Sequence, residues 1–168
     1  MYITTYASPV GEMTLAAEGD YLCGLWLAGQ KYFGGAVLAG ATKEVRDDLP
    51  VFDAARGWLV KYFAGKQPPI TDLVLQPGGS DFRQGVWKIL CDIPYGETLT
   101  YGAIARQLGC KSAQAVGGAV GHNPISLIIP CHRVVGADGG LTGYAGGVDV
   151  KRRLLALERG EVDWHKLG

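Results

Sequence analysis

A stretch rich in proline and glycine divides this chain into two parts, and no other feature limits the fold as strongly. Residues 67–79 hold three of the eight prolines and a Gly-Gly pair, at Pro68, Pro69, Pro77 and Gly78-Gly79. Such a segment does not fit the interior of a helix or a central strand. We therefore expect a connector between a unit over residues 1–75 and a unit over residues 80–168. The class is α/β of the α+β kind, with strands before the connector and helices after it.

The part before the connector has the pattern of a small strand-and-helix unit. Three β-prone runs separated by turn residues cover residues 2–6, 13–18 and 21–27. The Gly19-Asp20 pair between the last two runs predicts a hairpin. From Asp47 to Phe63 apolar residues recur at helical spacing, and glycine and proline residues close the segment, which predicts one helix.

The part after the connector is predicted to be mainly helical. Ser80 or Asp81 can cap a first helix that runs to about Leu90. Thr100 precedes a second helix over residues 101–108, and Ser112 can cap a third over residues 113–121. Two short helices joined by a glycine-containing turn are typical of a DNA-binding helix-turn-helix, although an ordinary helical hairpin has the same pattern.

The third of these helices is almost without bulky side chains. It contains Ala113, Ala115, Gly117, Gly118 and Ala119, although a glycine costs about 1 kcal/mol in a helix interior relative to alanine. One explanation is close packing against another helix. The other is close approach of the backbone to a ligand, since a narrow helix suits a groove as tight as the DNA minor groove, roughly 6 Å wide.

A cysteine that follows a proline is the main candidate for chemistry. The apolar run Leu127-Ile128-Ile129 is expected to be a buried strand that leads into Pro130-Cys131-His132. Because proline cannot continue a central ladder, Cys131 is expected on a rigid bend at the end of this strand. Cysteine is a strong nucleophile for alkyl transfer when a base or a positive environment gives it thiolate character. His132 is the nearest base, and the pair needs a turn or a bridging water to cooperate.

Charge and cysteine usage limit the possible functions further. The 16 basic and 16 acidic residues balance, with 6 against 8 in residues 1–80 and 10 against 8 in residues 81–168. The excess of two positive charges in residues 81–168 is too small to identify a nucleic-acid binder by itself. No apolar run is long enough to cross a bilayer and no export signal is visible, so we expect no membrane partner and a cytoplasmic location. The four cysteines lack metal-site spacing, and no metal is expected.

The motifs of the second part, taken in order, resemble those of the O6-alkylguanine-DNA alkyltransferases, which move an alkyl group from guanine in DNA to a cysteine of their own. The resemblance covers most of residues 80–160, whereas the first part is similar only in layout. The motifs are Phe82 to Leu90, Thr100-Tyr101, Ala115 to Ala119, Asn123-Pro124, Pro130 to Val135, Gly143 to Gly147, and Lys151 through Leu155 to Glu158.

The resemblance implies direct-reversal DNA repair by a methylated-DNA–protein-cysteine methyltransferase. The protein would act once, on O6-alkylguanine flipped out of the DNA, with O4-alkylthymine as a further candidate substrate and without a cofactor. Its partner would be double-stranded DNA with alkylated bases, bound through the minor groove. No obligate protein partner is evident, and a monomer is expected.

The resemblance also implies roles for individual residues. Cys131 would accept the alkyl group, His132 would take its proton through a water, and Glu158 would orient the histidine. Asn123 would be the hinge between the third helix and the active-site turn, and Tyr101 would press on a DNA phosphate and donate to the departing base. The other residues expected to contact DNA or the substrate base are Thr100, Gln114, Ala115, Gly117, Gly118, Arg133, Val135, Tyr144, Ala145 and Lys151.

One position departs from the family pattern. Gln114 stands where the recognition helix normally carries an arginine that fills the gap left by the flipped base. Glutamine can still fill space and hydrogen-bond the orphaned cytosine, but it carries no charge. Weaker DNA binding or an altered range of lesions is the expected consequence.

Two other functions stay open. A lesion-recognising relative would flip damaged bases without repairing them, although such proteins lack the acceptor cysteine and Cys131 is present. A Cys-His hydrolase would turn over repeatedly, whereas a transferase would stop at one equivalent of product.

Overall fold

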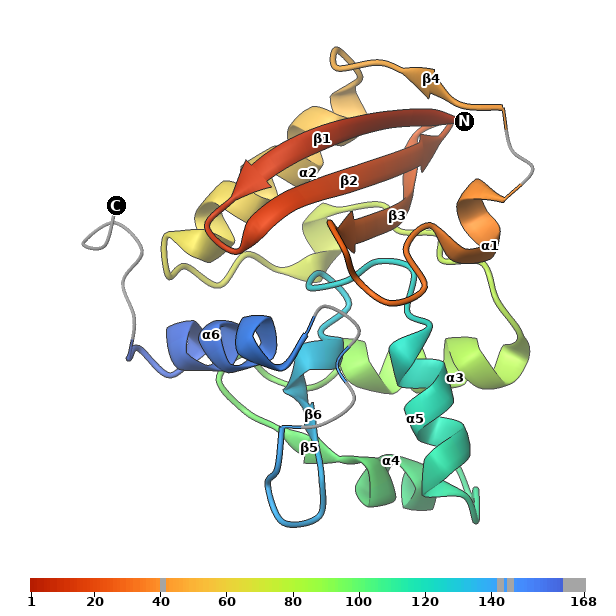
Figure 1. Ribbon diagram of the computed structural model, residues 1–168, viewed down its shortest axis with the longest axis vertical. Helices are drawn as coiled ribbons and strands as arrows, with labels where there is room; N and C mark the ends of the chain where they lie inside the picture. Colours follow the sequence, from red (N-terminus) through yellow and green to blue (C-terminus); the bar gives the residue numbers. More distant parts are fainter. Residues whose placement is uncertain (40–41, 142–143, 145–146, 162–168) are drawn as a thin grey trace.

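The computed structural model describes residues 1–39, 42–141, 144 and 147–161 of the chain. It confirms the α+β class, with a four-stranded sheet and a long helix in the N-terminal part and a mainly helical C-terminal part (Figure 1). The strands are β1 (Tyr2–Ser8), β2 (Gly11–Glu18), β3 (Tyr21–Leu27), β4 (Glu44–Val45), β5 (Leu99–Thr100) and β6 (Val134–Val135). The helices are α1 (Gly35–Leu38), α2 (Pro50–Phe63), α3 (Asp81–Cys91), α4 (Tyr101–Gln107), α5 (Ala113–Gly121) and α6 (Val148–Glu158), with 3-10 turns η1 (Ile70–Asp72) and η2 (Cys131–Arg133).

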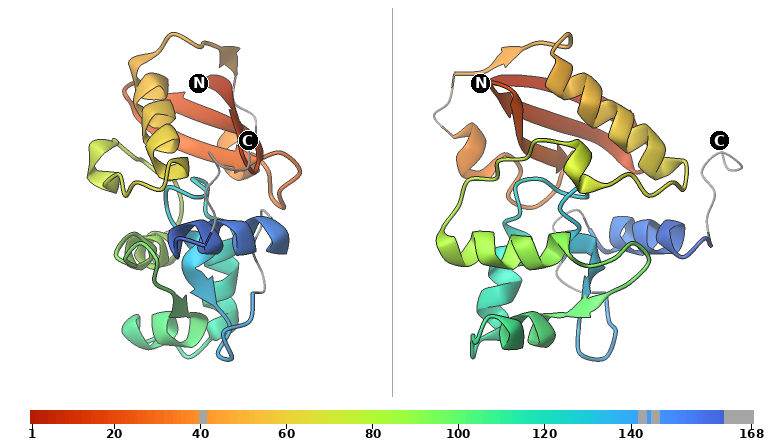
Figure 2. Two further views of the ribbon diagram at one scale, coloured as in Figure 1. Left: turned by 90° about the vertical axis from the view of Figure 1, so that its left-hand side faces the viewer. Right: turned by 180° about the vertical axis from the view of Figure 1, so that it is seen from behind.

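The N-terminal sheet has the strand order β3-β2-β1-β4, with β4 parallel to β1 and the other pairs antiparallel. The predicted hairpin is confirmed, because Glu18 pairs with Tyr21 and Gly19 has a φ of 55°, a left-handed conformation that suits glycine. Helix α2 covers one face of the sheet, as the view from behind in Figure 2 shows. It begins at Pro50 and not at Asp47, because proline fits the first helical position, where its missing N–H is not needed.

The outer edge of β3 joins the two parts of the chain. Leu22 exchanges two backbone hydrogen bonds of 2.9 Å with the connector, and Leu25 exchanges two of 2.8 and 3.0 Å with residues 124–126, shortly before Cys131. These bonds cover a strand edge that would otherwise be exposed. The hydrophobic core continues from the sheet and α2 into the C-terminal helices.

The C-terminal helices begin where the capping residues predicted. The side-chain oxygens of Ser80, Thr100 and Ser112 each accept a backbone N–H three residues ahead, at 3.3, 3.1 and 3.0 Å, which satisfies a donor that the helix leaves free. Helix α3 packs against α5, where the indole Nε1 of Trp87 donates to the carbonyl of Ala119 at 2.8 Å. Close helix packing therefore accounts for some of the small residues of α5.

The prediction of a buried strand over Leu127-Ile128-Ile129 is wrong. These residues are buried but form successive tight turns, with Leu127 at a φ of 70° and a 2.7 Å hydrogen bond from Cys131 N to Ile129 O. A short apolar run fits a buried turn as well as a buried strand, so its hydrophobicity could not decide between them. Cys131 consequently begins the 3-10 turn η2 and does not end a strand.

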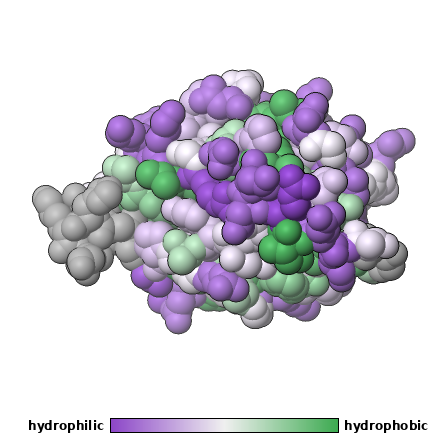
Figure 3. Space-filling model, turned by 90° about the horizontal axis from the view of Figure 1, so that it is seen from above, coloured by the Kyte–Doolittle hydropathy of each residue, from purple (hydrophilic) through white to green (hydrophobic). Residues whose placement is uncertain are grey.

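The end of the molecule nearest β1, β4 and α2 has a mostly hydrophilic surface, on which apolar side chains lie in separate spots (Figure 3). Among the residues that the structure describes, no helix has both the length and the apolar character needed to cross a membrane.

Candidate functional site

Cys131 lies at the start of η2 and is almost completely buried, with 3% of its surface exposed. Asn123, just beyond the end of α5, fixes the approach to it. The Asn123 amide donates to Ile129 O at 2.9 Å and to Ile125 O at 3.3 Å, and its oxygen accepts from Ile125 N at 3.0 Å. One side chain thus ties α5 to the turn that carries the cysteine.

The surroundings of Cys131 act on its ionisation in opposite directions. Burial raises the pKa of the thiol, while a hydrogen bond from Asn123 and the positive charge of Lys151 partly oppose the rise. The net pKa is higher than the ordinary value, so the group is a thiol at neutral pH. A nucleophilic role therefore needs a base to remove the proton.

His132 and Glu158 form a buried pair next to the cysteine. The His132 Nε2 lies 2.6 Å from Glu158 Oε2, and neither side chain has exposed surface. Burial alone would raise the pKa of Glu158, but His132 and Arg133 outweigh it and hold this pKa well below its ordinary value. Burial lowers the pKa of His132. The pair is therefore a neutral imidazole that donates from Nε2 to a carboxylate, which leaves Nδ1 as a proton acceptor.

That Nδ1 atom is buried and has no hydrogen-bond partner among the described residues. A buried imidazole nitrogen with a free lone pair, on the residue next to a buried thiol, is what a general base for Cys131 requires.

Arg133, expected from the sequence to contact DNA, instead points inward. Its Nε and Nη2 donate to the two oxygens of Glu158 at 2.7 and 3.2 Å, and Nη1 donates to Ile93 O at 2.7 Å. A buried carboxylate needs such a bidentate partner to stay ionised. The expected DNA contact by this side chain is therefore corrected: Arg133 supports Glu158.

Lys151, also expected to bind DNA or substrate, is fully buried on α6. Burial lowers the pKa of its ammonium, and the nearby Cys131 opposes this shift. The structure thus places Lys151 in the interior, within electrostatic reach of Cys131, and not on an exposed surface.

Tyr62 is the site residue that sequence reasoning missed. It lies on α2 in the N-terminal part, and its hydroxyl donates to Glu158 Oε2 at 2.6 Å, with His132 Nε2 at 3.5 Å. Burial, followed by the charge of Glu158, raises the pKa of Tyr62 well above its ordinary value. In the sequence Tyr62 is one apolar position of an amphipathic helix, and nothing marks its hydroxyl as functional.

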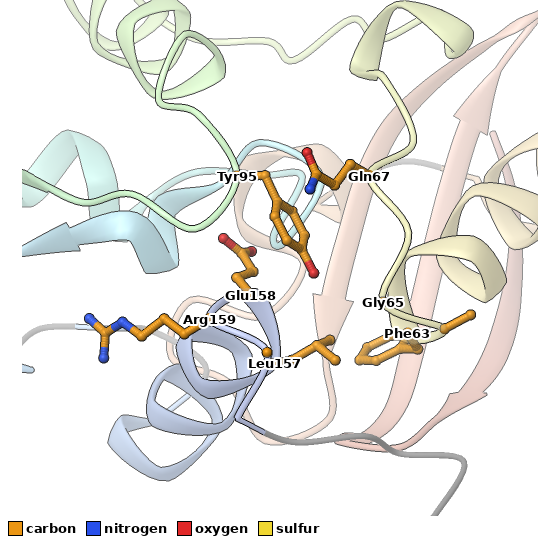
Figure 4. A pocket seen from close by; sticks show the side chains of 9 residues that line it. Phe63, Gly65, Gln67, Tyr95, Leu157, Glu158 and Arg159 are labelled. Carbon is orange, nitrogen blue, oxygen red and sulfur yellow. The ribbon is translucent and has the colours of Figure 1, made fainter.

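The far side of Glu158 faces a cavity of about 470 Å³ between the ends of α2 and α6. Figure 4 shows Gln67 and Glu158 near the Tyr95 ring, and Phe63 next to Leu157. The Arg133 guanidinium lies 5.7 Å from the centre of the Tyr95 ring. The hydrogen bonds from Tyr62 and Arg133 hold the carboxylate, and the Glu158 side chain has no exposed surface although its residue lines the cavity.

A groove of about 600 Å³ lies on the other side of the site, along α5. It contains several of the residues predicted to contact DNA or substrate: Tyr101, Gln114, Gly117, Gly118 and Tyr144. Burial raises the pKa of Tyr101 and of Tyr144, and the charge of Cys131 adds to both shifts. Tyr144 belongs to the same hydrophobic cluster as Cys131, and Tyr101 packs against that cluster.

The remaining predicted residues take different positions. Thr100 caps α4 and pairs with the buried Val135 between β5 and β6, while Ala115 is exposed on α5. Ala145, with most of the segment Gly143 to Gly147, lies outside the described residues. Within the described ranges, no three side chains of histidine, cysteine, aspartate or glutamate come together as metal ligands.

Replacing Tyr62 with phenylalanine should lower the free energy of unfolding by about 1.5–3 kcal/mol, because a buried carboxylate loses a hydrogen-bond donor. It should also raise the pKa of Glu158, since the lost bond favoured the charged form. Denaturant unfolding from pH 7 to pH 3 measures both effects. Tyr21→Phe, at the start of β3, is the matched control and should change the stability by less than about 0.5 kcal/mol. Equal stability of the two variants at every pH would show that Tyr62 does not stabilise the Glu158 carboxylate.

The chain matches two family models, which describe the DNA binding domain (residues 81–160) and the ribonuclease-like domain (residues 1–77) of 6-O-methylguanine DNA methyltransferase. The methylated-DNA–protein-cysteine methyltransferase of Mycobacterium tuberculosis H37Rv is 46% identical over 160 residues, 95% of this chain and 93% of the relative. The protein of that name from Haemophilus influenzae is 40% identical over 160 residues, 95% and 87% of the two chains. The crystal structure of Mycobacterium tuberculosis OGT in complex with DNA superposes with a TM-score of 0.85 at 44% identity, covering 97% of this chain and 96% of that one.

Proposed function

This chain belongs to the 6-O-methylguanine DNA methyltransferase family, and on that basis we propose that it repairs DNA by moving the alkyl group of O6-alkylguanine to Cys131. The observation that carries the proposal is the buried thiol beside a neutral imidazole, with a carboxylate that Arg133 keeps ionised.

The chemistry follows from these groups. His132 Nδ1 takes the thiol proton of Cys131 through a bridging water, and Glu158 stabilises the imidazolium that forms. The sulfur attacks the alkyl carbon while the bond from that carbon to O6 breaks, and the electron pair stays on the guanine. The Tyr101 hydroxyl donates a proton to the departing base, and the proton held by His132 then returns to the Tyr101 phenolate, which leaves both side chains neutral. Overall, the thiol hydrogen is exchanged for the alkyl group.

Lys151 and Asn123 assist the cysteine in this scheme. The ammonium of Lys151 and the amide of Asn123 both favour the thiolate. Because the thioether product is not hydrolysed, each molecule acts once.

The DNA would lie on α5, the second helix of a helix-turn-helix formed with α4. A methyl group added at Gly118 or Gly121 would meet no heavy atom of the described residues within 4 Å. Packing within the protein therefore does not require glycine there, which supports close approach of α5 to the DNA minor groove. The reacting base must leave the helical stack to reach the buried Cys131.

The groove along α5 would receive the flipped base. Tyr101 would rotate the nucleotide by pressing on its phosphate, Tyr144 would form a wall of the base pocket, and Gln114 would fill the gap in the duplex. The backbone of Val135 and the segment containing Ala145 would bind the guanine edge. We further propose units over residues 1–75 and 80–168, a monomer, and a cytoplasmic location, which the four free cysteines suit.

A titration of duplex DNA containing O6-methylguanine tests the proposal. Methyl loss from the DNA should stop at one equivalent per protein molecule, however long the incubation. Continued turnover would indicate a hydrolase. Binding of the lesion without methyl loss would indicate a lesion-recognition protein.

A further inference from the structure

One wall of the groove along α5 comes from the N-terminal part of the chain. The loop of residues 28–34 follows β3, and its residues Lys31 and Tyr32 line the groove opposite Gln114 and the glycines of α5. Sequence reasoning assigned no function to this loop.

Tyr32 fastens the loop to the end of α5. Its ring stacks on the imidazole of His122, with centroids 3.9 Å apart and an angle of 22° between the planes. The His122 Nδ1 donates to Gly118 O at 2.7 Å, so the imidazole on which Tyr32 stacks is itself held in place. Tyr32 has a φ of 61°, which is unusual for a tyrosine, and 46% of its surface is exposed. An exposed aromatic residue held in a strained conformation is typical of a functional position.

The base of the loop is anchored as well. The buried oxygen of Gln30 accepts from Leu27 N at 2.8 Å and from Ser126 Oγ at 3.2 Å, which ties the loop to the segment before Cys131. Lys31 lies between these two fixed points, with its Nζ 5.1 Å from the centre of the Tyr32 ring. The ammonium group is therefore held at the rim of the groove.

The groove has little charge of its own. Helix α5 contains no charged residue, and among the described residues that line the groove only Lys31 carries a permanent charge. Gln114, which lines the same groove, is neutral and gives this wall no positive charge.

We propose that Lys31 binds a backbone phosphate of the DNA and so supplies the positive charge that Gln114 lacks, with the Tyr32–His122 stack holding it in place. This inference rests on the proposed function, because it assumes that DNA lies along α5. A lysine contact of this kind is electrostatic and independent of base sequence, so it adds affinity and salt dependence and does not add sequence specificity.

Fluorescence anisotropy with undamaged duplex DNA at several salt concentrations tests the inference. Lys31→Gln should weaken binding about 3–10-fold at low salt and reduce the slope of log K against log salt by about one, as loss of one phosphate contact predicts. Tyr32→Leu should weaken binding in the same direction. Lys66→Gln, an exposed lysine beyond α2 that does not line the groove, is the matched control and should match the unmodified protein.

Gln114→Arg introduced together with Lys31→Gln should restore the affinity, because the charge returns to the other wall of the groove. Equal affinity and slope for Lys31→Gln and Lys66→Gln would overturn the inference. If the double variant bound DNA as weakly as Lys31→Gln alone, a charge at position 114 would not replace the charge of Lys31. If the unmodified protein itself neither bound duplex DNA nor removed the methyl group, the proposed function would fail first.

Discussion

Replacing Glu158 with glutamine should lower the free energy of unfolding by about 3–5 kcal/mol, the usual effect of removing one partner from a buried ion pair. The carboxylate accepts hydrogen bonds from Arg133, His132 and Tyr62, and its loss leaves the buried guanidinium without a counter-charge. In a chain of this size the melting temperature should fall by roughly 10 °C. Thermal and denaturant unfolding measure the change.

The control is Asp149→Asn, which removes an exposed ion pair of 3.0 Å with Arg152 and should cost less than about 1 kcal/mol. The pH dependence gives a second check. Because the pKa of Glu158 is lower in the folded state, its contribution is complete above the unfolded value of about 4.3 and is lost as the pH falls towards the folded value. Glu158→Gln should lack this part of the acid-induced loss. If Glu158→Gln were as stable as Asp149→Asn, Glu158 would not be the buried partner of Arg133 that the structure shows.

Replacing His132 with glutamine should slow methyl transfer at pH 7 by about 10²–10⁴-fold, the usual contribution of a general base. The glutamine amide can still donate to Glu158, so the buried pair keeps a hydrogen bond while Nδ1 is lost. Single-turnover assays on DNA containing O6-methylguanine measure the rate.

The deficit should shrink as the pH rises, because the thiol then ionises without help. Burial keeps the pKa of Cys131 above its ordinary value, so recovery should occur only in alkaline solution. An unchanged rate at pH 7 would remove His132 from the proton path, and a deficit that is the same at every pH would show that its role is only structural.

Local signals predicted most of the fold. The Gly19-Asp20 turn and the capping residues Ser80, Thr100 and Ser112 act within three or four residues of themselves, so the sequence alone determines what they do. The turns before Cys131 were mistaken for a strand because their form depends on the edge of β3, to which residues 124–126 bond.

The site could be predicted only in part. The chemistry of the residues alone predicts Cys131 as the nucleophile and His132 as the nearest base, whereas the role of Glu158 follows only from the family resemblance. No spacing in the sequence shows that residues 26 positions apart share a 2.6 Å contact. Arg133 was assigned to DNA because a lone arginine gives no sign of pointing inward. Tyr62 and Lys31 were missed because each reaches the site or its groove from the N-terminal part, through tertiary packing that no local pattern encodes.

In the proposed reaction Cys131 accepts the alkyl group, and intact mass spectrometry shows whether it does. The protein is incubated with duplex DNA containing O6-methylguanine, beside a Cys131→Ser variant and a Cys110→Ser control. We expect the unmodified protein and Cys110→Ser each to gain one methyl group in place of one hydrogen, with peptide mapping placing it on Cys131, and the Cys131→Ser variant to gain none. No gain in mass by the folded protein, or a methyl group on another residue, would show that Cys131 is not the alkyl acceptor.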